Sequence, residues 1–240
     1  MQSKPKNNID HNNEYFETWS PEAFANCANY QNTLRKFSSS FIRGDVLDIG
    51  CGSRVYYNFK NIDKWTGVDL SKKMINEIQF FDNIDDSKLT LDQGDATNLE
   101  YKDNSFDTVC AFFIIHHLAK ESKDISEKRV ISTLKHAKRV LRQDGCMVVA
   151  ENASGPLEWP YHLMYSLFYK AAKKLFNIEM PYFWRKKQFY NLAKNAGFSK
   201  VNCVHLTVDE WIYNPVLKIK VPPILSSSLF QTMTLYILEK

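Results

Sequence analysis

The chain has 240 residues and a mass of 28.0 kDa, with 44% hydrophobic, 14% aromatic and 24% charged residues. This composition excludes an intrinsically disordered chain, and the low count of 8 glycines excludes a collagen-like or flexible low-complexity one. The net charge of +4 permits an acidic ligand but lacks the basic excess of a typical nucleic-acid binder. We therefore expect a folded globular protein that does not bind nucleic acid.

Signals for export and for membrane insertion are weak in this sequence. The 5 cysteines contain no C-x-x-C pair, which argues against a disulfide framework or a thiolate zinc site and favours a reducing compartment. The first residues, MQSKPKNNIDHNNE, show no apolar signal-peptide core. The longest apolar run, Val109 to Ile115, is far shorter than the roughly 20 residues that span a bilayer. We expect a cytoplasmic protein without stable membrane insertion, of open oligomeric state.

The first predicted element is a helix ahead of the sheet. Ser20, Pro21 and Glu22 match the N-cap, the first-turn proline and the first-turn acid of a helix start. Apolar residues then recur at helical spacing, namely Phe24, Cys27, Ala28, Leu34 and Phe37.

From Asp45 onward, short β-rich runs alternate with amphipathic helices. The runs are apolar throughout rather than alternating, which predicts a sheet covered on both faces. One long helix has Val130, Ile131, Leu134, Ala137, Val140 and Leu141 on one face and a predicted stop at Asp144-Gly145. Repeated β-α-β units of this kind predict an open, mostly parallel α/β sheet. The predicted strands are Val46–Ile49, Trp65–Asp69, Leu89–Gln93, Phe106–Phe113 and Cys146–Ala150.

The pattern changes after Glu151. Residues 152–160 are loop-like, and Pro222-Pro223 marks a connection between two later strands. No repeat and no linker is visible, so one domain is the simplest interpretation. The elements predicted here are helices over about Tyr161–Phe176 and up to Gly197, and strands near Val201–Leu206 and Thr232–Leu238.

The segment from Val46 to Ser53 carries the most informative local signal. It is an apolar strand that contains Asp48 near its end and is followed by Gly50 and Gly52. Ligands of open α/β sheets bind at the carboxyl ends of the strands, where glycine permits positive φ and close approach of the backbone to a ligand. A Gly-x-Gly alone is equally typical of a plain tight turn, so both interpretations stay open on this segment.

Two further predicted strands end with an acid at the same edge. Asp69 is placed to accept hydrogen bonds from the two ribose hydroxyls of an adenosine-containing ligand, and Asp95 suits an exocyclic amine. Ser71 suits the N-cap of the following helix. Helix caps or solvated turn acids explain each of these residues singly, but they explain acids at three successive strand ends poorly.

With these motifs the sequence resembles the class I S-adenosylmethionine-dependent methyltransferases of small-molecule type, from about Leu34 to Gly197. VLDIGCGS resembles the glycine loop, GVDLS the ribose-binding acid and QGDATNL the adenine-binding acid. FDTVCAFFIIHHL is similar to the fourth strand, and LKHAKRVLRQDGCMVVAEN to the helix, turn and strand after it. The resemblance implies a Rossmann-like, open, mostly parallel seven-stranded sheet with helices on both faces. It also implies an N-terminal helical lid and an inserted aromatic helix after the fifth strand.

The resemblance implies S-adenosyl-L-methionine as the cofactor and assigns residues to its parts. Asp48, Gly50 and Gly52 would hold the methionine part, with Cys51 between the glycines. The remaining assignments are Asp69 with Leu70 at the ribose, Asp95 and the Ala96 N–H at the adenine, and Phe112 and Phe113 along the cofactor. No metal is required, because no H-x-x-H or H-E-x-x-H spacing occurs.

The glycine loop departs from the family at one position. Arg54 stands where a third glycine is frequent, and Val55, Tyr56 and Tyr57 follow it. We expect that the helix after the loop packs less closely there and that its start is displaced. The same residues argue against a nicotinamide enzyme, because G-x-G-x-x-G requires glycine at Val55.

Two adjacent histidines follow the fourth predicted strand. Transfer to a hydroxyl or an ammonium requires a group that takes the proton, and histidine has a suitable pKa. His116 and His117 are therefore the candidate catalytic residues, with His117 as the first choice. The alternative is that the pair only caps the next helix.

An aromatic stretch, Trp159 to Trp184, occupies the position of a substrate cover in the family. Trp159, Tyr169 and Trp184 exceed one face of the predicted helix and favour an apolar or aromatic pocket. The stripe on the other residues is typical of core packing and consists of Tyr161, Met164, Tyr165, Phe168, Ala171, Ala172, Leu175 and Phe176. Lysines and an arginine near it could steer an anionic substrate or contact anionic lipid, although a solvated helix face explains them as well. These basic residues are Lys170, Lys173, Lys174, Arg185, Lys186 and Lys187.

The resemblance also implies a domain organisation. We expect a single methyltransferase domain, 1–240, with an N-terminal lid over 1–40 in which Tyr15, Phe16 and Trp19 fold over the cofactor. The cofactor-binding core is 41–151, the substrate-cover insertion is 152–187, and 188–240 completes the sheet.

The function that follows is methyl transfer to a small-molecule acceptor by in-line displacement. The paired histidines slightly favour O- or N-methylation, and the aromatic stretch favours an apolar or aromatic acceptor. C-methylation of a quinone- or polyketide-like molecule and a non-catalytic cofactor-binding scaffold are the alternatives. Nucleic-acid methylation is disfavoured, because residues 111–114 read AFFI rather than Asn/Asp-Pro-Pro-Tyr/Phe and no Pro-Cys occurs.

Overall fold

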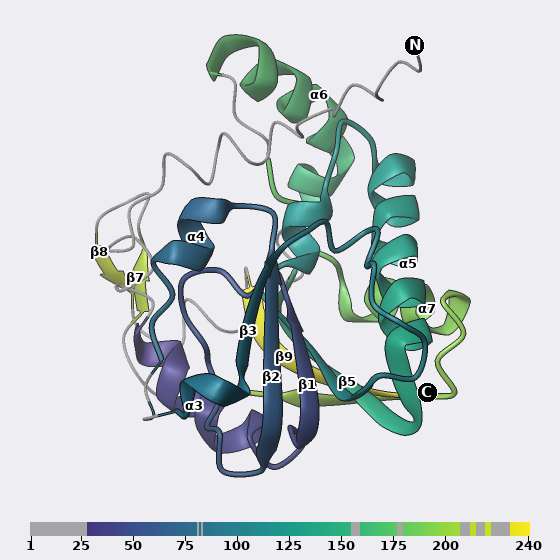
Figure 1. The fold of residues 1–240 in the computed structure, drawn as a ribbon. Helices are drawn as coiled ribbons and strands as arrows, with labels where there is room; N and C mark the ends of the chain where they lie inside the picture. Colours follow the sequence, from purple (N-terminus) through teal and green to yellow (C-terminus); the bar gives the residue numbers. More distant parts are fainter. Residues whose placement is uncertain are drawn as a thin grey trace, which may run out of the picture.

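A computed structural model describes residues 28–80, 82, 84–154, 159–176, 180–206, 212–214, 219–221 and 231–240. Its centre is a seven-stranded sheet in the order β3-β2-β1-β4-β5-β9-β6 (Figure 1). The neighbours from β3 to β5 pair in parallel, and β9 runs antiparallel to both β5 and β6. The strands are β1 Gly44–Ile49, β2 Ile62–Asp69, β3 Leu89–Gln93, β4 Phe106–Phe112, β5 Leu141–Ser154, β6 Lys200–His205 and β9 Gln231–Glu239.

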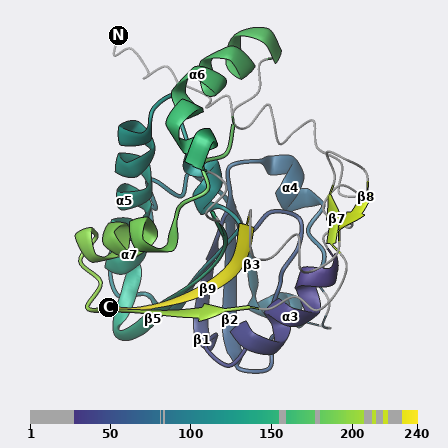
Figure 2. The same cartoon turned by 180° about the vertical axis from the view of Figure 1, so that it is seen from behind.

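Helices cover the sheet on both faces, as predicted. Figures 1 and 2 place α5 and α7 on one side of the sheet and α3 on the other. Successive strand residues join separate apolar clusters: Leu47 packs with Val130 of α5, whereas its neighbour Val46 packs with Leu34 of α3. The helices are α3 Ala28–Ser38, α4 Lys72–Asn76, α5 Lys123–Val140, α6 Trp159–Phe176 and α7 Lys186–Asn195, with 3-10 turns η1 Asp86–Lys88 and η2 Ile115–Leu118.

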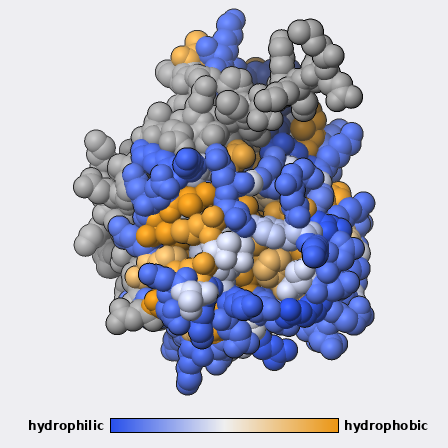
Figure 3. Space-filling view, in the orientation of Figure 1, coloured by the Kyte–Doolittle hydropathy of each residue, from blue (hydrophilic) through white to orange (hydrophobic). Residues whose placement is uncertain are grey.

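The predicted mostly parallel Rossmann-like sheet is thus confirmed, and so is the N-cap Ser71, whose side chain accepts from the N–H of Met74. β3 lies at one edge, and its Leu91 is 39% exposed. Figure 3 shows hydrophobic side chains in the middle of this face of the molecule, with hydrophilic ones around them. A small hairpin of β7 Ile212–Asn214 and β8 Ile219–Val221 was not predicted. The start of the N-terminal helix, the lid residues Tyr15, Phe16 and Trp19, and Pro222-Pro223 lie outside the described residues.

β5 is longer than the sequence predicts at both ends. The helix stop predicted at Asp144-Gly145 is wrong, because α5 ends at Val140 and Leu141 already begins the strand. The predicted loop at residues 152–160 is wrong at both of its described ends, while residues 155–158 lie outside the described part of the chain. Asn152 pairs with Met233, Ser154 pairs with Gln231, and α6 begins at residue 159. Pairing with β9 extends the strand, and it depends on residues about 80 positions away that local patterns do not reveal.

The connection from β1 to β2 contains no helix, so the expected helix after the glycine loop is wrong. Arg54 instead forms an isolated parallel β-bridge with Gln79. Val55 and Tyr57 are each 1% exposed, and Tyr56 is 9% exposed. Three consecutive buried side chains do not fit one face of a helix, which explains why this connection runs as an irregular segment inside the apolar cluster.

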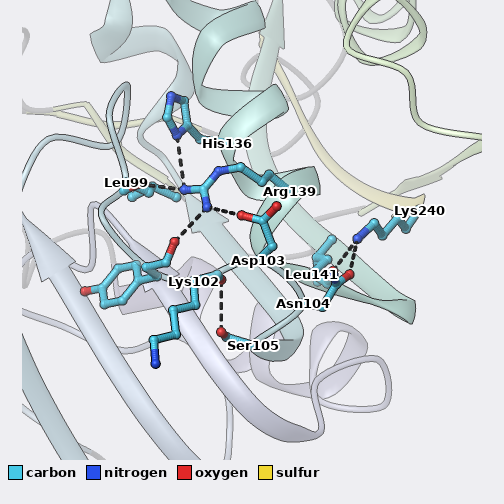
Figure 4. Close-up of polar contacts among 10 residues, drawn as sticks. Leu99, Lys102, Asp103, Asn104, Ser105, His136, Arg139, Leu141 and Lys240 are labelled. Atoms are coloured by element: carbon cyan, nitrogen blue, oxygen red, sulfur yellow. Dashed lines mark hydrogen bonds and ion pairs between the residues drawn. The ribbon is translucent and has the colours of Figure 1, made fainter.

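Arg139, in the last turn of α5, fastens the connection between β3 and β4 (Figure 4). Its guanidinium donates to the carbonyls of Leu99 and Tyr101 (2.7 Å each) and to Asp103 Oδ1 (2.6 Å). Lys240 Nζ donates nearby to Asn104 Oδ1 (2.7 Å). These hydrogen bonds attach the segment between β3 and β4 to helix α5.

Candidate active site

The carboxyl end of β1 places an acid inside the protein. Asp48 is 3% exposed, and its Oδ2 accepts a hydrogen bond from the Tyr57 hydroxyl (2.7 Å). The Tyr57 oxygen in turn accepts from Trp65 Nε1 (2.7 Å). Asp48 Oδ1 is buried and has no hydrogen-bond partner among the described residues. Because an unpaired buried carboxylate oxygen is costly, this atom points to a ligand group that donates to it.

Burial raises the pKa of Asp48 to about 7, and the nearby charge of Asp69 adds to the rise while the Tyr57 hydrogen bond opposes it. The two carboxylates therefore lie close together at the ends of adjacent strands. A cation beside Asp48 would favour its ionised form. The end of β1 thus suits an ammonium group.

The glycine loop and the end of β2 are joined by hydrogen bonds. Asp69 Oδ2 accepts from the Gly52 N–H (2.9 Å), and Asp69 Oδ1 accepts from the Ser71 N–H (2.8 Å). Gly50 and Gly52 both have positive φ, +62° and +59°. A Cβ added at Gly50 would lie 2.3 Å from Ile114 Cδ1, whereas one added at Gly52 would meet nothing within 4 Å. Gly52 therefore faces open space, as backbone beside a ligand would.

The end of β3 lies next to that of β2. Asp95 Oδ1 accepts from both the N–H and the hydroxyl of Thr97 (2.8 Å each), which orients the carboxyl group. Ala96 is 7% exposed. Gln93 Nε2 donates to the carbonyl of Leu70 (3.0 Å), so the residues after β2 and β3 are held together.

The end of β4 contributes aromatic rings. Phe112 is buried, and its ring stacks with Tyr56 at 6.1 Å between centroids. Phe113 has φ +58°, an uncommon conformation for a non-glycine residue, and its N–H donates to the carbonyl of Ala150 (2.8 Å). The Phe113 ring meets Tyr56 edge-on at 5.4 Å. Strained backbone of this kind concentrates at functional sites.

The histidine pair is organised by a residue that the sequence analysis missed. Glu151, in β5, is 5% exposed and accepts from the Ile115 N–H through Oε1 (2.7 Å). Its Oε2 lies 2.7 Å from Nδ1 of His116. A carboxylate can only accept, so His116 Nδ1 carries the proton and Nε2 is left as the acceptor. The signal was present: Glu151 follows the apolar run of its strand as the acids of β1 and β2 do.

The two histidines differ in their surroundings. The His116 ring stacks on Phe183 at 5.0 Å, and the His116 carbonyl accepts from the Tyr182 N–H (2.9 Å). Burial, with the neighbouring His116 as the second cause, lowers the pKa of His117 well below its ordinary value. His117 is therefore neutral at pH 7 and a poor proton acceptor. The structure brings the two rings together, with 4.0 Å between their centroids, and Glu151 orients the ring of His116.

Residues 47–149 match the family described as "Methyltransferase domain". Together with the strand order and the acids at three adjacent strand ends, this match decides the type of domain. Over residues 47–149 the chain carries a methyltransferase domain, and its fold is that of the class I S-adenosylmethionine-dependent enzymes. Its cofactor is S-adenosyl-L-methionine.

Curated relatives and solved structures agree with this assignment. The chain is 29% identical over 149 residues to a demethylmenaquinone methyltransferase of Staphylococcus saprophyticus, an alignment that covers 56% of this chain and 59% of the relative. It is 30% identical over 134 residues to the Staphylococcus epidermidis enzyme of the same name, with 56% and 50% covered. The chain thus spans little more than half the length of these relatives.

Two solved structures share the fold at low sequence identity. A Haloferax volcanii methyltransferase in complex with the activator Trm112 has a TM-score of 0.65 at 16% identity, over 95% of this chain and 97% of that one. A Thermotoga maritima methyltransferase described as a possible histamine N-methyltransferase has a TM-score of 0.55 at 19% identity, over 97% and 98%. At these identities the likeness supports the fold only.

The residues of the methyltransferase domain fit its cofactor. The unpaired Oδ1 of Asp48 suits the ammonium of the methionine part, and the open space before Gly52 leaves room for the ligand. Asp69 keeps acceptor capacity, because each carboxylate oxygen can take a second hydrogen bond.

Alanine at the two loop glycines is expected to separate folding from binding. An alanine at either position would have to adopt a positive φ, which costs about 1–2 kcal/mol. At Gly50 its methyl group would in addition overlap Ile114. We expect Gly50→Ala to lower the free energy of unfolding by about 2–4 kcal/mol, and Gly52→Ala by only about 1 kcal/mol. Gly52→Ala should weaken binding of S-adenosylhomocysteine in calorimetry at least tenfold. Unchanged affinity in Gly52→Ala would contradict the placement of the cofactor.

Proposed function

We propose that this chain is an enzyme that transfers the methyl group of S-adenosylmethionine to a small-molecule acceptor by in-line displacement. The observation that carries the proposal is the oriented pair His116–Glu151 beside an acid-lined glycine loop. His116 lies in η2, which follows β4, and Glu151 lies in β5; the glycine loop follows β1, the strand next to β4. A scaffold that only binds the cofactor has no use for a buried carboxylate that sets the tautomer of a histidine.

Each candidate cofactor residue has a role in this proposal. Asp48 Oδ1 binds the ammonium, the Gly50-Cys51-Gly52 backbone lies along the methionine part, and Asp69 with Leu70 binds the ribose. Asp95 and the Ala96 N–H bind the adenine, with Phe112 and Phe113 beside the cofactor. When bound, S-adenosylmethionine supplies an electrophilic sulfonium methyl group. The protein contributes position and orientation, which account for a large part of such rate enhancements.

The proton of the acceptor is taken by His116. Glu151 holds the proton of the ring on Nδ1, so Nε2 accepts the proton of an acceptor hydroxyl as that oxygen gains nucleophilicity. The resulting imidazolium is stabilised by the buried carboxylate of Glu151. His117, whose pKa is lowered by burial, lines the site instead of acting as the base. The base role moves from His117, the first choice of the sequence analysis, to its neighbour.

The segment that follows α6 belongs to the proposed substrate cover, residues 152–187. Phe183 stacks on His116, and Tyr182 donates its backbone N–H to the same residue. We propose that Phe183, which stacks on His116, forms one wall of the acceptor site, and an aromatic wall suits a ring-shaped acceptor. We therefore propose a hydroxylated aromatic acceptor in a cytoplasmic biosynthetic reaction.

C-methylation is a second candidate, because the curated relatives are demethylmenaquinone methyltransferases. Loss of the proton from a ring hydroxyl increases electron density on the adjacent ring carbons as well as on the oxygen. The same base at His116 therefore serves both outcomes. The position of the ring relative to the cofactor decides which atom is methylated.

The test is a transfer assay with methyl-labelled S-adenosylmethionine and a panel of phenols, hydroquinones and amines, read by mass spectrometry. Labelled product from a phenol or hydroquinone supports the proposal, and fragmentation distinguishes the O-methyl from the C-methyl product. Cofactor binding in calorimetry without transfer to any acceptor would favour the scaffold. Asp69→Ala should abolish both binding and transfer. Transfer by Asp69→Ala at the unaltered rate would contradict the site.

A further inference from the structure

Helix α6 presents an apolar face to solvent. Leu163, Leu167 and Leu175 are 76%, 61% and 68% exposed, and Met164 and Phe168 are 40% and 39% exposed. The sequence analysis interpreted the helical stripe, which includes Met164, Phe168 and Leu175, as core packing. That interpretation holds for Tyr165 but is wrong for these three residues.

The helix cannot turn this face inward. Tyr165 and Tyr169 are 2% and 4% exposed and anchor the opposite side of α6. The Tyr165 hydroxyl donates to the carbonyls of Lys120 (3.0 Å) and Met180 (3.1 Å), which lie on either side of it. Figures 1 and 2 show α6 beyond the carboxyl ends of the strands, with one end extending away from the sheet. The exposed leucines are therefore a fixed surface feature.

The charged residues of α6 are all lysines. The sequence of α6, WPYHLMYSLFYKAAKKLF, contains no acidic residue. Leu163, Leu167, Lys170 and Lys174 follow one another at spacings of four, three and four, so they form one row along the helix. Lys170 and Lys174 are exposed and make no ion pair in the part of the chain that the structure describes. Met164, Phe168, Ala171 and Leu175 form the adjacent row.

We propose that this face of α6 rests on an anionic lipid surface. Leucine, phenylalanine and lysine side by side, without acids, are the composition of helices that lie in the membrane interface. The lysines complement lipid phosphates, and the apolar row enters the acyl boundary. A convex helix offers a protein partner no groove to fill, whereas lipid adapts to it. None of the described helices is long and apolar enough to cross a bilayer.

The contact would adjoin the candidate active site. Tyr165 of α6 meets Tyr182 edge-on at 4.8 Å, and the Tyr182 N–H donates to the His116 carbonyl. The side of α6 opposite the exposed leucines thus connects, through Tyr182, to the proposed base. The lipid contact itself does not depend on the proposed function, and its test uses no activity.

The test is flotation of the purified full-length protein with vesicles of pure phosphatidylcholine or with about one-third phosphatidylglycerol. We expect the protein to float with the anionic vesicles and to be released by high salt. Leu163→Glu with Leu167→Glu should lower the partition coefficient at least tenfold on anionic vesicles. Lys170→Glu with Lys174→Glu should remove the preference for phosphatidylglycerol. Lys128→Glu, an exposed lysine of α5, is the matched control and should float as the wild type does.

Three results would overturn the proposal. One is absence of wild-type flotation with anionic vesicles at low salt, and another is flotation that none of the α6 substitutions changes. The third is a lipid-free dimer that Leu163→Glu dissociates in analytical ultracentrifugation while flotation is unaffected, which would assign the face to a second copy of the chain. The four substituted side chains of α6 are exposed, so we expect these variants to fold, and circular dichroism checks this.

Discussion

Asp48→Asn is expected to stabilise the unliganded protein at pH 8 and to weaken cofactor binding. Asp48 is buried, its Oδ1 has no partner among the described residues, and burial raises its pKa to about 7. At pH 8 the native state must hold an uncompensated buried charge, which the amide removes while its oxygen still accepts from Tyr57. We expect a gain of about 2 kcal/mol in the free energy of unfolding. Affinity for S-adenosylhomocysteine should fall about 10–100-fold, because a charge-assisted hydrogen bond is lost.

The pH dependence of stability gives this prediction a sign. The unfolded state releases the proton near pH 3.8, whereas the native state keeps it until about pH 7. Between these values the native state binds more protons, so the free energy of unfolding falls as pH rises, and it levels above pH 7. The difference between wild type and Asp48→Asn isolates this group, since His117 and other titrations cancel. Denaturant titrations from pH 4 to pH 8.5 measure it.

Cofactor affinity should show the opposite trend. A bound ammonium favours ionised Asp48, so binding below pH 7 requires release of a proton and becomes stronger as pH rises from 6 to 8. Asp48→Asn should bind weakly at every pH. Asp144→Asn changes an exposed acid near the start of β5, at the other end of this strand from Glu151, and should match the wild type in both measurements. A flat difference curve, or unchanged affinity in Asp48→Asn, would rule out this role.

The meeting of Asp48, Asp69 and Asp95 at one edge of the sheet could be predicted because its signals are local. Asp69 and Gly52 lie 17 residues apart, yet each is marked by its own strand end, and parallel strands bring such ends to one edge. The apolar runs of β1 and β4 are also local signals, and they predict that both faces of these strands are buried.

Features that depend on distant partners could not be predicted in this way. β5 continues to Ser154 because β9 pairs with it, and Glu151 acquires its role only when η2 carries the Ile115 N–H and His116 onto it. The irregular segment at Val55 is irregular because an apolar cluster surrounds it, which periodicity does not reveal. The exposed face of α6 was misjudged because helical spacing of apolar residues shows that a face exists and leaves open what covers it.

Glu151→Gln is expected to lower kcat about 10²–10³-fold and to leave the affinity for S-adenosylhomocysteine unchanged. In the wild type the carboxylate keeps the proton of His116 on Nδ1 and leaves Nε2 free to accept. The glutamine oxygen can still accept from Ile115, but its amide then donates to Nδ1 and moves the ring proton to Nε2. An imidazole in that tautomer cannot take the proton of an acceptor hydroxyl. The acids proposed to bind the cofactor, Asp48, Asp69 and Asp95, lie at the ends of β1 to β3, none of which is adjacent to β5 in the sheet.

The acidity of the acceptor provides the readout that distinguishes a positioning role from a structural one. An acceptor that is already ionised needs no base, so the loss of kcat in Glu151→Gln should shrink with phenols of low pKa and at pH values above that of the acceptor. His116→Gln should show the same dependence, and the double variant should be little worse than either single one. Glu121→Gln, an exposed residue ahead of α5, is the control. A loss of equal size for every acceptor at every pH, or additive effects of the two substitutions, would mean that Glu151 only supports the fold and that the proton leaves by another route.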